Sequence, residues 1–331
     1  MANQPVLSSA GIKAYSVANL TQSQINQLGP LANLIGVWEN APAPEGKTST
    51  GWNVIMVPGP QNGFKLEVMP YSEVLEFKPV VIAAANKGPF SGNNEEVQHI
   101  VGLMYNQKIT SLCHDQCTDP DLKAPNVIHM ETGLFLNVKD FNTQAGLENS
   151  NGLVLDFARL ATIPHGNSVL AIGQTRQPKG FSSGSIKSIS GLPEPINDFD
   201  SFRIGYLTGL ENPSPSARPF PEFPDMDPNH FLNDTIKGQT FSNVWEITMD
   251  TGNATGGILN IPFIQNNVTT SQVSSSFWIE QLTNGTWQLQ YSQFIYLLFP
   301  GPGSNGKPIQ VKWPHTTINT LRKSNLTTMT Y

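Results

Sequence analysis

The sequence predicts an all-β protein, a closed antiparallel β-barrel of roughly ten strands with short flanking helices and a long lid-like insertion. Many short segments alternate apolar and polar residues, as strands do, and turns rich in Gly and Pro separate them; the chain of 331 residues holds 28 Gly and 26 Pro. Charged residues make up only 13% of the chain, about half the ~25% of ordinary soluble domains. This composition excludes a helical bundle or a coiled coil, which would be rich in Glu and Lys.

The first expected element is a helix from Thr21 to Leu34. Thr21 is suited to cap it, because Gln24 occupies the capping-box position three residues later. Pro30 should divide the segment into two short turns, since proline lacks the N–H that a helix interior needs.

Strands are expected next, because the apolar period changes to two after this helix. A Met69-Pro70 turn should separate the second from the third of these strands, and a last short helix is expected from Pro314 to Lys323, with Ile318 and Leu321 as its apolar contacts. The expected strands are 52–57, 64–68, 72–77, 96–105, 127–138, 152–162, 168–175, 242–249, 275–282 and 287–299.

The whole chain, residues 1–331, is expected to form one barrel domain with two insertions. Residues 106–126 form a loop that carries both cysteines, and residues 177–237 are rich in Pro, Gly and Ser but also in aromatic side chains. A flexible linker would not carry these aromatic residues, so we expect an ordered flap over the barrel mouth. The alternative is an insertion that packs outside the barrel.

Charge and targeting patterns exclude several classes of protein. The net charge of −6, from 19 basic and 25 acidic residues, argues against a nucleic-acid binder, which needs a basic face. The longest apolar run, Val80 to Ala85, is too short to span a bilayer. The opening Met1–Pro5 has neither the basic nor the apolar region of a signal peptide, so a cytoplasmic location is expected.

Three groups of segments resemble the nitrobindin-type heme-binding β-barrels, a lipocalin-like and fatty-acid-binding-protein-like family. Residues 163–167, Ile-Pro-His-Gly-Asn, also resemble a motif of longer bacterial and fungal relatives. The segments that carry the resemblance are 34–38, 51–55 and 71–77 at the start, 129–135, 161–166 and 171–173 in the middle, and 290–299 with 314–321 at the end.

The resemblance implies a heme site. It implies that His315, with Trp313 beside it, supplies the axial ligand of the iron, and that His165 lies on the distal side or acts as a general acid or base. Residue types alone favour an exposed histidine at a helix start for His315, and only the resemblance makes an iron ligand equally favoured. For His165 they favour a residue of a Pro-His-Gly-Asn turn, which does not exclude a role in function.

Two further clusters bear on chemistry. His129 and Glu131 alternate along one strand and so share a face, where the carboxylate of Glu131 can orient an imidazole or take part in proton transfer. Cys113 and Cys117 flank His114, but structural zinc needs four ligands, which only Asp119 or Asp121 could complete. A disulfide or two free thiols therefore explain the cysteines better than zinc.

Three functions remain open, and whether the protein is an enzyme is open with them. The first is a barrel that holds heme or a similar flat apolar ligand, with gas-binding or peroxide-linked redox activity. The second is a heme-free, lipocalin-like cyclase or isomerase of an apolar metabolite, with His165 and Glu131 transferring protons. The third is a carrier of fatty-acid-like molecules, which needs no catalytic residue.

Overall fold

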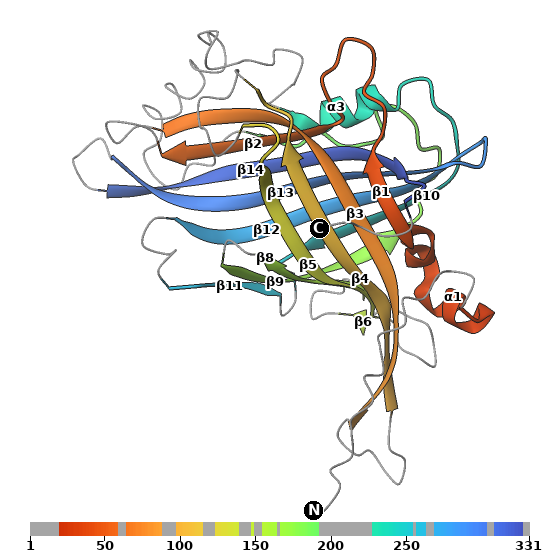
Figure 1. Ribbon diagram of the computed structural model, residues 1–331. Helices are drawn as coiled ribbons and strands as arrows, with labels where there is room; N and C mark the ends of the chain where they lie inside the picture. Colours follow the sequence, from red (N-terminus) through yellow and green to blue (C-terminus); the bar gives the residue numbers. More distant parts are fainter. Residues whose placement is uncertain are drawn as a thin grey trace, which may run out of the picture.

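The structure, a computed structural model, is a closed antiparallel β-barrel with short helices at one end and on its outer wall (Figure 1). Ten strand positions close the ring, so the predicted barrel of roughly ten strands is confirmed. The structure describes residues 20–58, 64–87, 97–114, 123–138, 147–148, 154–163, 166–191, 227–253, 256–262, 268–302 and 308–326.

Each strand that the sequence predicts overlaps a strand of the barrel, whereas the barrel strands β1, β11 and β14 were not expected. A separate two-stranded sheet pairs β6 (Leu147–Glu148) with β7 (Val154–Leu155). The strands of the main sheet are β1 (Gly36–Asn40), β2 (Gly51–Pro58), β3 (Phe64–Lys87), β4 (Val97–Ser111), β5 (Val127–Asn137), β8 (Phe157–Ile163), β9 (Asn167–Arg176), β10 (Phe241–Asp250), β11 (Gly257–Asn260), β12 (Thr269–Leu282), β13 (Trp287–Pro302) and β14 (Pro308–Lys323).

The ring closes between β3 and β14, where β1 and β2 share one strand position at two heights. β2 pairs with β3 along its whole length and with β14 at residues 316–318. β1 pairs with β3 and with β14 nearer one end of the barrel. This double seam joins the N-terminal and C-terminal parts of the sheet and leaves no open edge there.

The predicted first helix is confirmed as α1 (Gln22–Leu28) followed by the 3₁₀ helix η2 (Gly29–Leu34). The Thr21 side chain accepts from the backbone N–H of Gln24, and the Thr21 N–H donates to the Gln24 side chain, which completes the capping box. Leu28, Leu31 and Leu34 are buried and pack against the residues that fill one end of the barrel.

Aromatic side chains fill the barrel interior next to these leucines. Phe135 stands at the centre, with its ring centroid 5.0–5.4 Å from four other rings. This half of the barrel is therefore a packed core with little space for a ligand. The buried aromatic residues of this core are Trp38, Phe77, Tyr105, Phe135, Phe157, Phe277 and Tyr291.

The last element corrects the sequence prediction: residues 314–323 belong to strand β14 and not to a helix. Ile318 and Leu321 suggested a helix because both are apolar and three residues apart. In the strand they face opposite sides, Leu321 toward the interior core and Ile318 toward a cluster on the outer wall. Both faces of β14 are buried, so the alternation that identifies a half-exposed strand is missing here.

The turn expected at Met69-Pro70 is also absent, because both residues lie within the long strand β3. Pro70 pairs with Trp52 of β2, but the pairing of β3 with β4 begins only at the next residue, opposite Ser111. The ladder with β4 therefore does not require the N–H that proline lacks.

The described parts of the 177–237 insertion, residues 177–191 and 227–237, pack against the outside of the barrel wall, while residues 192–226 lie outside the described residues. Helix α3 (Pro228–Thr235) contacts β13 and β14 there (Figure 1). The placement of these described parts is the one that the alternative, an insertion outside the barrel, expects. We call this group the outer cluster; it includes Trp52, Trp278 and Ile318 of the wall and Ile186, Phe231 and Leu232 of the insertion.

The expected loop 106–126 is shorter than predicted, because residues 106–111 continue strand β4. Cys113 is buried and disulfide-bonded, and the other cysteine of the chain, Cys117, lies outside the described residues together with Asp119 and Asp121. Among the described residues, no group of three or more His, Cys, Asp or Glu side chains could hold a metal ion.

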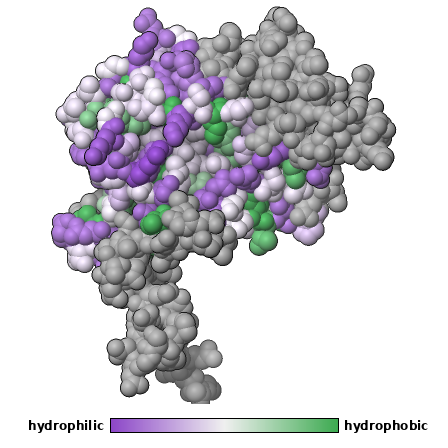
Figure 2. All heavy atoms as spheres, turned by 180° about the vertical axis from the view of Figure 1, so that it is seen from behind, coloured by the Kyte–Doolittle hydropathy of each residue, from purple (hydrophilic) through white to green (hydrophobic). Residues whose placement is uncertain are grey.

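The described surface is mixed in polarity. Figure 2 shows one face, on which apolar residues are dispersed among polar ones. Within the described part of the chain, no helix is both long enough and apolar enough to cross a membrane.

Candidate functional site

The half of the barrel away from α1 contains a cavity of about 290 Å³. Inward-facing residues of alternate positions form its wall, as strand β13 illustrates: Leu289 and Tyr291 belong to the packed core, and Gln293 and Ile295 line the cavity. Five isoleucines make the wall largely apolar, namely Ile55, Ile109, Ile128, Ile163 and Ile295.

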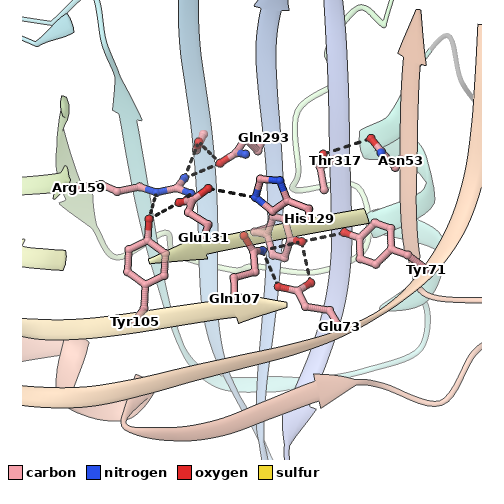
Figure 3. Close-up of polar contacts among 12 residues, drawn as sticks. Asn53, Tyr71, Glu73, Tyr105, Gln107, His129, Glu131, Arg159, Gln293 and Thr317 are labelled. Carbon is pink, nitrogen blue, oxygen red and sulfur yellow. Dashed lines mark hydrogen bonds and ion pairs between the residues drawn. The ribbon is translucent and has the colours of Figure 1, made fainter. Parts of the chain in front are cut away.

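A buried ion pair lies between the cavity and the aromatic core (Figure 3). Arg159 of β8 and Glu131 of β5 are 2.5 Å apart, from Nη2 to Oε1, and their side chains are almost fully buried. The hydroxyl of Tyr105 donates to Glu131 and accepts from Arg159 Nε. Arg159 also lies over the rings of Phe135 and Phe277. A buried charge is stable only with such partners.

The ion pair fixes the charges of its members. Burial raises the pKa of Glu131, but Arg159 and the hydrogen bonds from His129 and Tyr105 outweigh it and lower the pKa to about 2. Burial lowers the pKa of Arg159, and Glu131 more than reverses this. Glu131 is therefore a carboxylate at neutral pH and has no proton to give.

His129 lies beside this carboxylate and lines the cavity. Its Nε2 is 3.4 Å from Oε2 of Glu131, and its side chain is 17% exposed (Figure 3). A carboxylate acceptor favours the tautomer that carries the proton on Nε2, so the lone pair of the neutral ring is on Nδ1.

Gln293 is hydrogen-bonded to the guanidinium of the ion pair, whereas His129 contacts the carboxylate. Its Oε1 accepts from Nη1 of Arg159 at 2.5 Å and from Ser275 Oγ at 3.2 Å. These two donors fix the orientation of the amide, so its Nε2 is left as a donor at the cavity, which Gln293 lines.

A second polar network surrounds Glu73. This buried carboxyl group accepts from Gln107 at 2.7 Å, Tyr291 at 2.7 Å and Asn319 at 2.8 Å. Burial raises the pKa of Glu73 above its ordinary value, although these three donors act in the opposite direction. Gln107 also lines the cavity; because its Nε2 donates to Glu73, its Oε1 remains as an acceptor there.

His315 lines the cavity from β14, in the middle of a strand. Its Nε2 donates to Oδ1 of Asn53 at 2.6 Å, and Thr317 donates to the same oxygen at 3.4 Å. The lone pair of the neutral imidazole is then on Nδ1. Trp313, two residues earlier on the same face of the strand, is buried and is not among the residues that line the cavity.

The structure brings some of the predicted site residues together and not others. His315 and His129 line one cavity, and Glu131 lies behind His129 and below the cavity surface. His165 lies outside the described residues; its chain neighbours Ile163 and Asn167 line the cavity.

The sequence reasoning missed four polar residues at the base of the cavity. With Glu131 and His129 they form a group that we call the polar floor; the four are Arg159, Gln293, Gln107 and Glu73. Arg159 stands alone in the apolar segment 157–163, which is the signal of a buried charge that needs a partner. The sequence of one strand does not predict which carboxylate is the partner of Arg159.

The cavity fits part of a heme group. His315 and His129 offer imidazole nitrogens, and the isoleucine wall suits a porphyrin. No Lys or Arg is among the described lining residues to pair with the propionates. A cavity of 150 Å³ binds one benzene ring, so 290 Å³ holds about two rings and a whole porphyrin would extend beyond it.

No family model matches the chain, and no curated protein matches it either.

Proposed function

We propose that the protein binds a small, flat, mostly apolar molecule in the barrel cavity. The observation that carries this proposal is the division of the interior: one half is packed with aromatic rings, and the other half encloses about 290 Å³ behind a wall of isoleucines. Pockets of this kind, apolar with a few fixed polar groups, are typical small-molecule sites.

The size and charge of the cavity define the ligand further. The volume suits about two fused rings. Arg159 is already neutralised by Glu131, so the floor favours an uncharged polar group on the ligand over a carboxylate. A fatty-acid-like ligand is therefore less well supported than a neutral ring compound.

Heme is the second candidate, and the position of His315 favours it. The resemblance to nitrobindin-type barrels assigns the axial ligand to this histidine, and its imidazole lines the cavity. In such a site His315 would hold the iron, Asn53 would orient the imidazole through Nε2, and the isoleucines would exclude water. Bound heme would supply gas binding or redox chemistry.

One titration experiment tests both candidates. The purified protein is titrated with the neutral two-ring fluorescent probe 1-naphthylamine and, separately, with hemin. Ile295→Trp places a large side chain in the cavity, while Val154→Trp, at a 49% exposed position of β7, is the matched control. We expect probe binding in the wild type and the control, and a loss of about tenfold or more in affinity in Ile295→Trp.

The hemin titration separates the two candidates. A Soret band that forms at one equivalent and is lost in His315→Gln would support heme. Binding of the naphthylamine probe without a specific Soret band would leave the compact ligand as the function. Equal probe binding in Ile295→Trp and in the wild type would show that the cavity is not the binding site, and the proposal would fail.

A further inference from the structure

We infer that the cavity is a proton-transfer site, in which His129 and Gln293 enolise a flat one- or two-ring ketone. This inference rests on the proposed function, since the ketone must bind in the cavity. It deepens that function by assigning an activity and a substrate class to the same residues.

Each member of the ion pair between Arg159 and Glu131 contacts one residue that lines the cavity: Glu131 contacts His129, and Arg159 contacts Gln293. Oε2 of Glu131 lies 3.4 Å from Nε2 of His129, and Nη1 of Arg159 lies 2.5 Å from Oε1 of Gln293. Figure 3 shows the imidazole of His129 next to the carboxylate of Glu131 and the amide of Gln293 next to the guanidinium of Arg159. Arg159 and Glu131 both stay charged, because the two side chains are buried and neutralise each other.

His129 has the properties of a general base. A carboxylate that is ionised at neutral pH accepts from its Nε2, which orients the ring and stabilises the imidazolium that forms when the ring takes a proton. The accepting nitrogen is then Nδ1. Hydrogen bonds of this kind are often long before a substrate binds, so 3.4 Å is compatible with the role.

Gln293 supplies the second element, a donor for a developing oxyanion. Its Oε1 is bonded to a guanidinium and to Ser275, which polarises the amide and fixes Nε2 as the group at the cavity. Fixed N–H donors stabilise the negative charge that appears on a carbonyl oxygen when an adjacent carbon loses a proton.

The reaction balances without any other reactant. Nδ1 of His129 takes a proton from the carbon next to the carbonyl, and the electron pair of that C–H bond forms the C=C bond of an enolate. The carbonyl oxygen receives the negative charge and accepts from Nε2 of Gln293. The imidazolium returns its proton to the same carbon, or to another carbon of the conjugated system, which yields an isomer.

The test uses 2-tetralone, a flat two-ring ketone, and measures deuterium uptake at its α-carbon in D₂O by mass spectrometry. His129→Gln keeps a hydrogen-bonding partner for Glu131 but has no basic nitrogen. His230→Gln is the matched control, because His230 is exposed on α3 outside the barrel, where it lies beside Asp234. Binding of 2-tetralone is measured separately by calorimetry, and folding by circular dichroism.

We expect His129→Gln to slow the exchange by about 100-fold or more relative to the wild type and to His230→Gln, which is the usual contribution of a general base. Its affinity for 2-tetralone should stay within about threefold of the wild type, since the isoleucine wall is unchanged. Gln293→Met, which removes the donor at similar volume, should lower kcat more than it changes KM.

Glu131 acts through His129 and is a positioning residue. Glu131→Gln should slow the exchange in the wild-type background but have no further effect in His129→Gln, whereas a merely structural role would lower both equally.

Two outcomes contradict the inference and differ in what they leave standing. If 2-tetralone binds and exchanges equally fast in the wild type and in His129→Gln, the proton-transfer role is overturned while the binding function stands. If the naphthylamine probe binds but 2-tetralone does not, the ketone class is overturned. If neither compound binds, the proposed function fails together with the inference.

Discussion

At the scale of single residues, the surroundings decide the charge of each buried glutamate. Glu131 has a guanidinium partner and is ionised, with its pKa lowered to about 2. Glu280 of β12 is equally buried but has only the amide of Gln288 as a donor, at 2.7 Å, and its Oε1 has no partner within the described residues. Burial therefore dominates and raises the pKa of Glu280 to about 8.

Glu280 should make the protein less stable in alkali. In the folded state it keeps its proton up to about pH 8, whereas in the unfolded chain it releases the proton near pH 4.5. The free energy of unfolding should fall as the pH rises from about 4.5 through 8, by on the order of a few kcal/mol. Urea unfolding at pH 5, 7 and 9 measures this fall.

Glu280→Gln should remove most of this dependence, because the amide does not titrate. Glu45→Gln, at an exposed position, is the matched control and should keep the wild-type profile. An unchanged slope in Glu280→Gln would show that Glu280 is not the group responsible.

At the scale of elements, the backbones of β9 and β10 approach so closely that a side chain at position 173 of β9 has no room. Gly173 lies opposite Met249 of β10. A Cβ atom added at Gly173 would be 1.8 Å from the backbone oxygen of Thr248. Backbone cannot move aside as a flexible side chain can, so the β9–β10 pair depends on the missing side chain.

Gly173→Ala should destabilise the protein by about 2 kcal/mol or more, the cost of forcing extra atoms into a packed site. Gly257→Ala, on the adjacent strand β11, is the control, because a Cβ atom there meets nothing within 4 Å. Urea unfolding of both variants measures the difference. Equal stability of the two would show that the sheet relaxes at Gly173.

At the scale of the whole molecule, the long insertion enters and leaves the described structure at one place on the outer wall. The backbone N–H of Ile189 donates to the Asp227 side chain at 3.1 Å, so the two ends of residues 192–226 are close together. The flanking residues Ile186 and Phe231 are buried in the outer cluster.

Replacement of residues 192–226 by a short Gly-Ser linker should therefore leave the barrel folded and the cavity able to bind the naphthylamine probe. Deletion of residues 181–231 should instead expose the outer cluster and cause unfolding or aggregation, because it removes buried apolar side chains. Circular dichroism and the probe titration compare the two. A folded protein after the larger deletion would show that the outer cluster is dispensable.

The sequence by itself determined the features that depend on residues close together in the chain, namely the first helix and most of the strands. The capping box joins residues three apart, so α1 could be predicted together with its division at Pro30. The period of two predicted the strands, since one face of a strand is usually buried and the other exposed. It failed for residues 314–323, because α3 and the rest of the outer cluster cover the second face of β14.

Only the tertiary structure decided how the polar floor of the cavity is built. Arg159 meets Glu131 28 residues away and Gln293 134 residues away, and His315 meets Asn53 262 residues away. Local sequence patterns cannot predict these contacts, because the partners lie on different strands whose register is set by the closure of the ring. His129 lines the cavity for the same reason, because barrel closure turns the inward face of every strand toward one shared space.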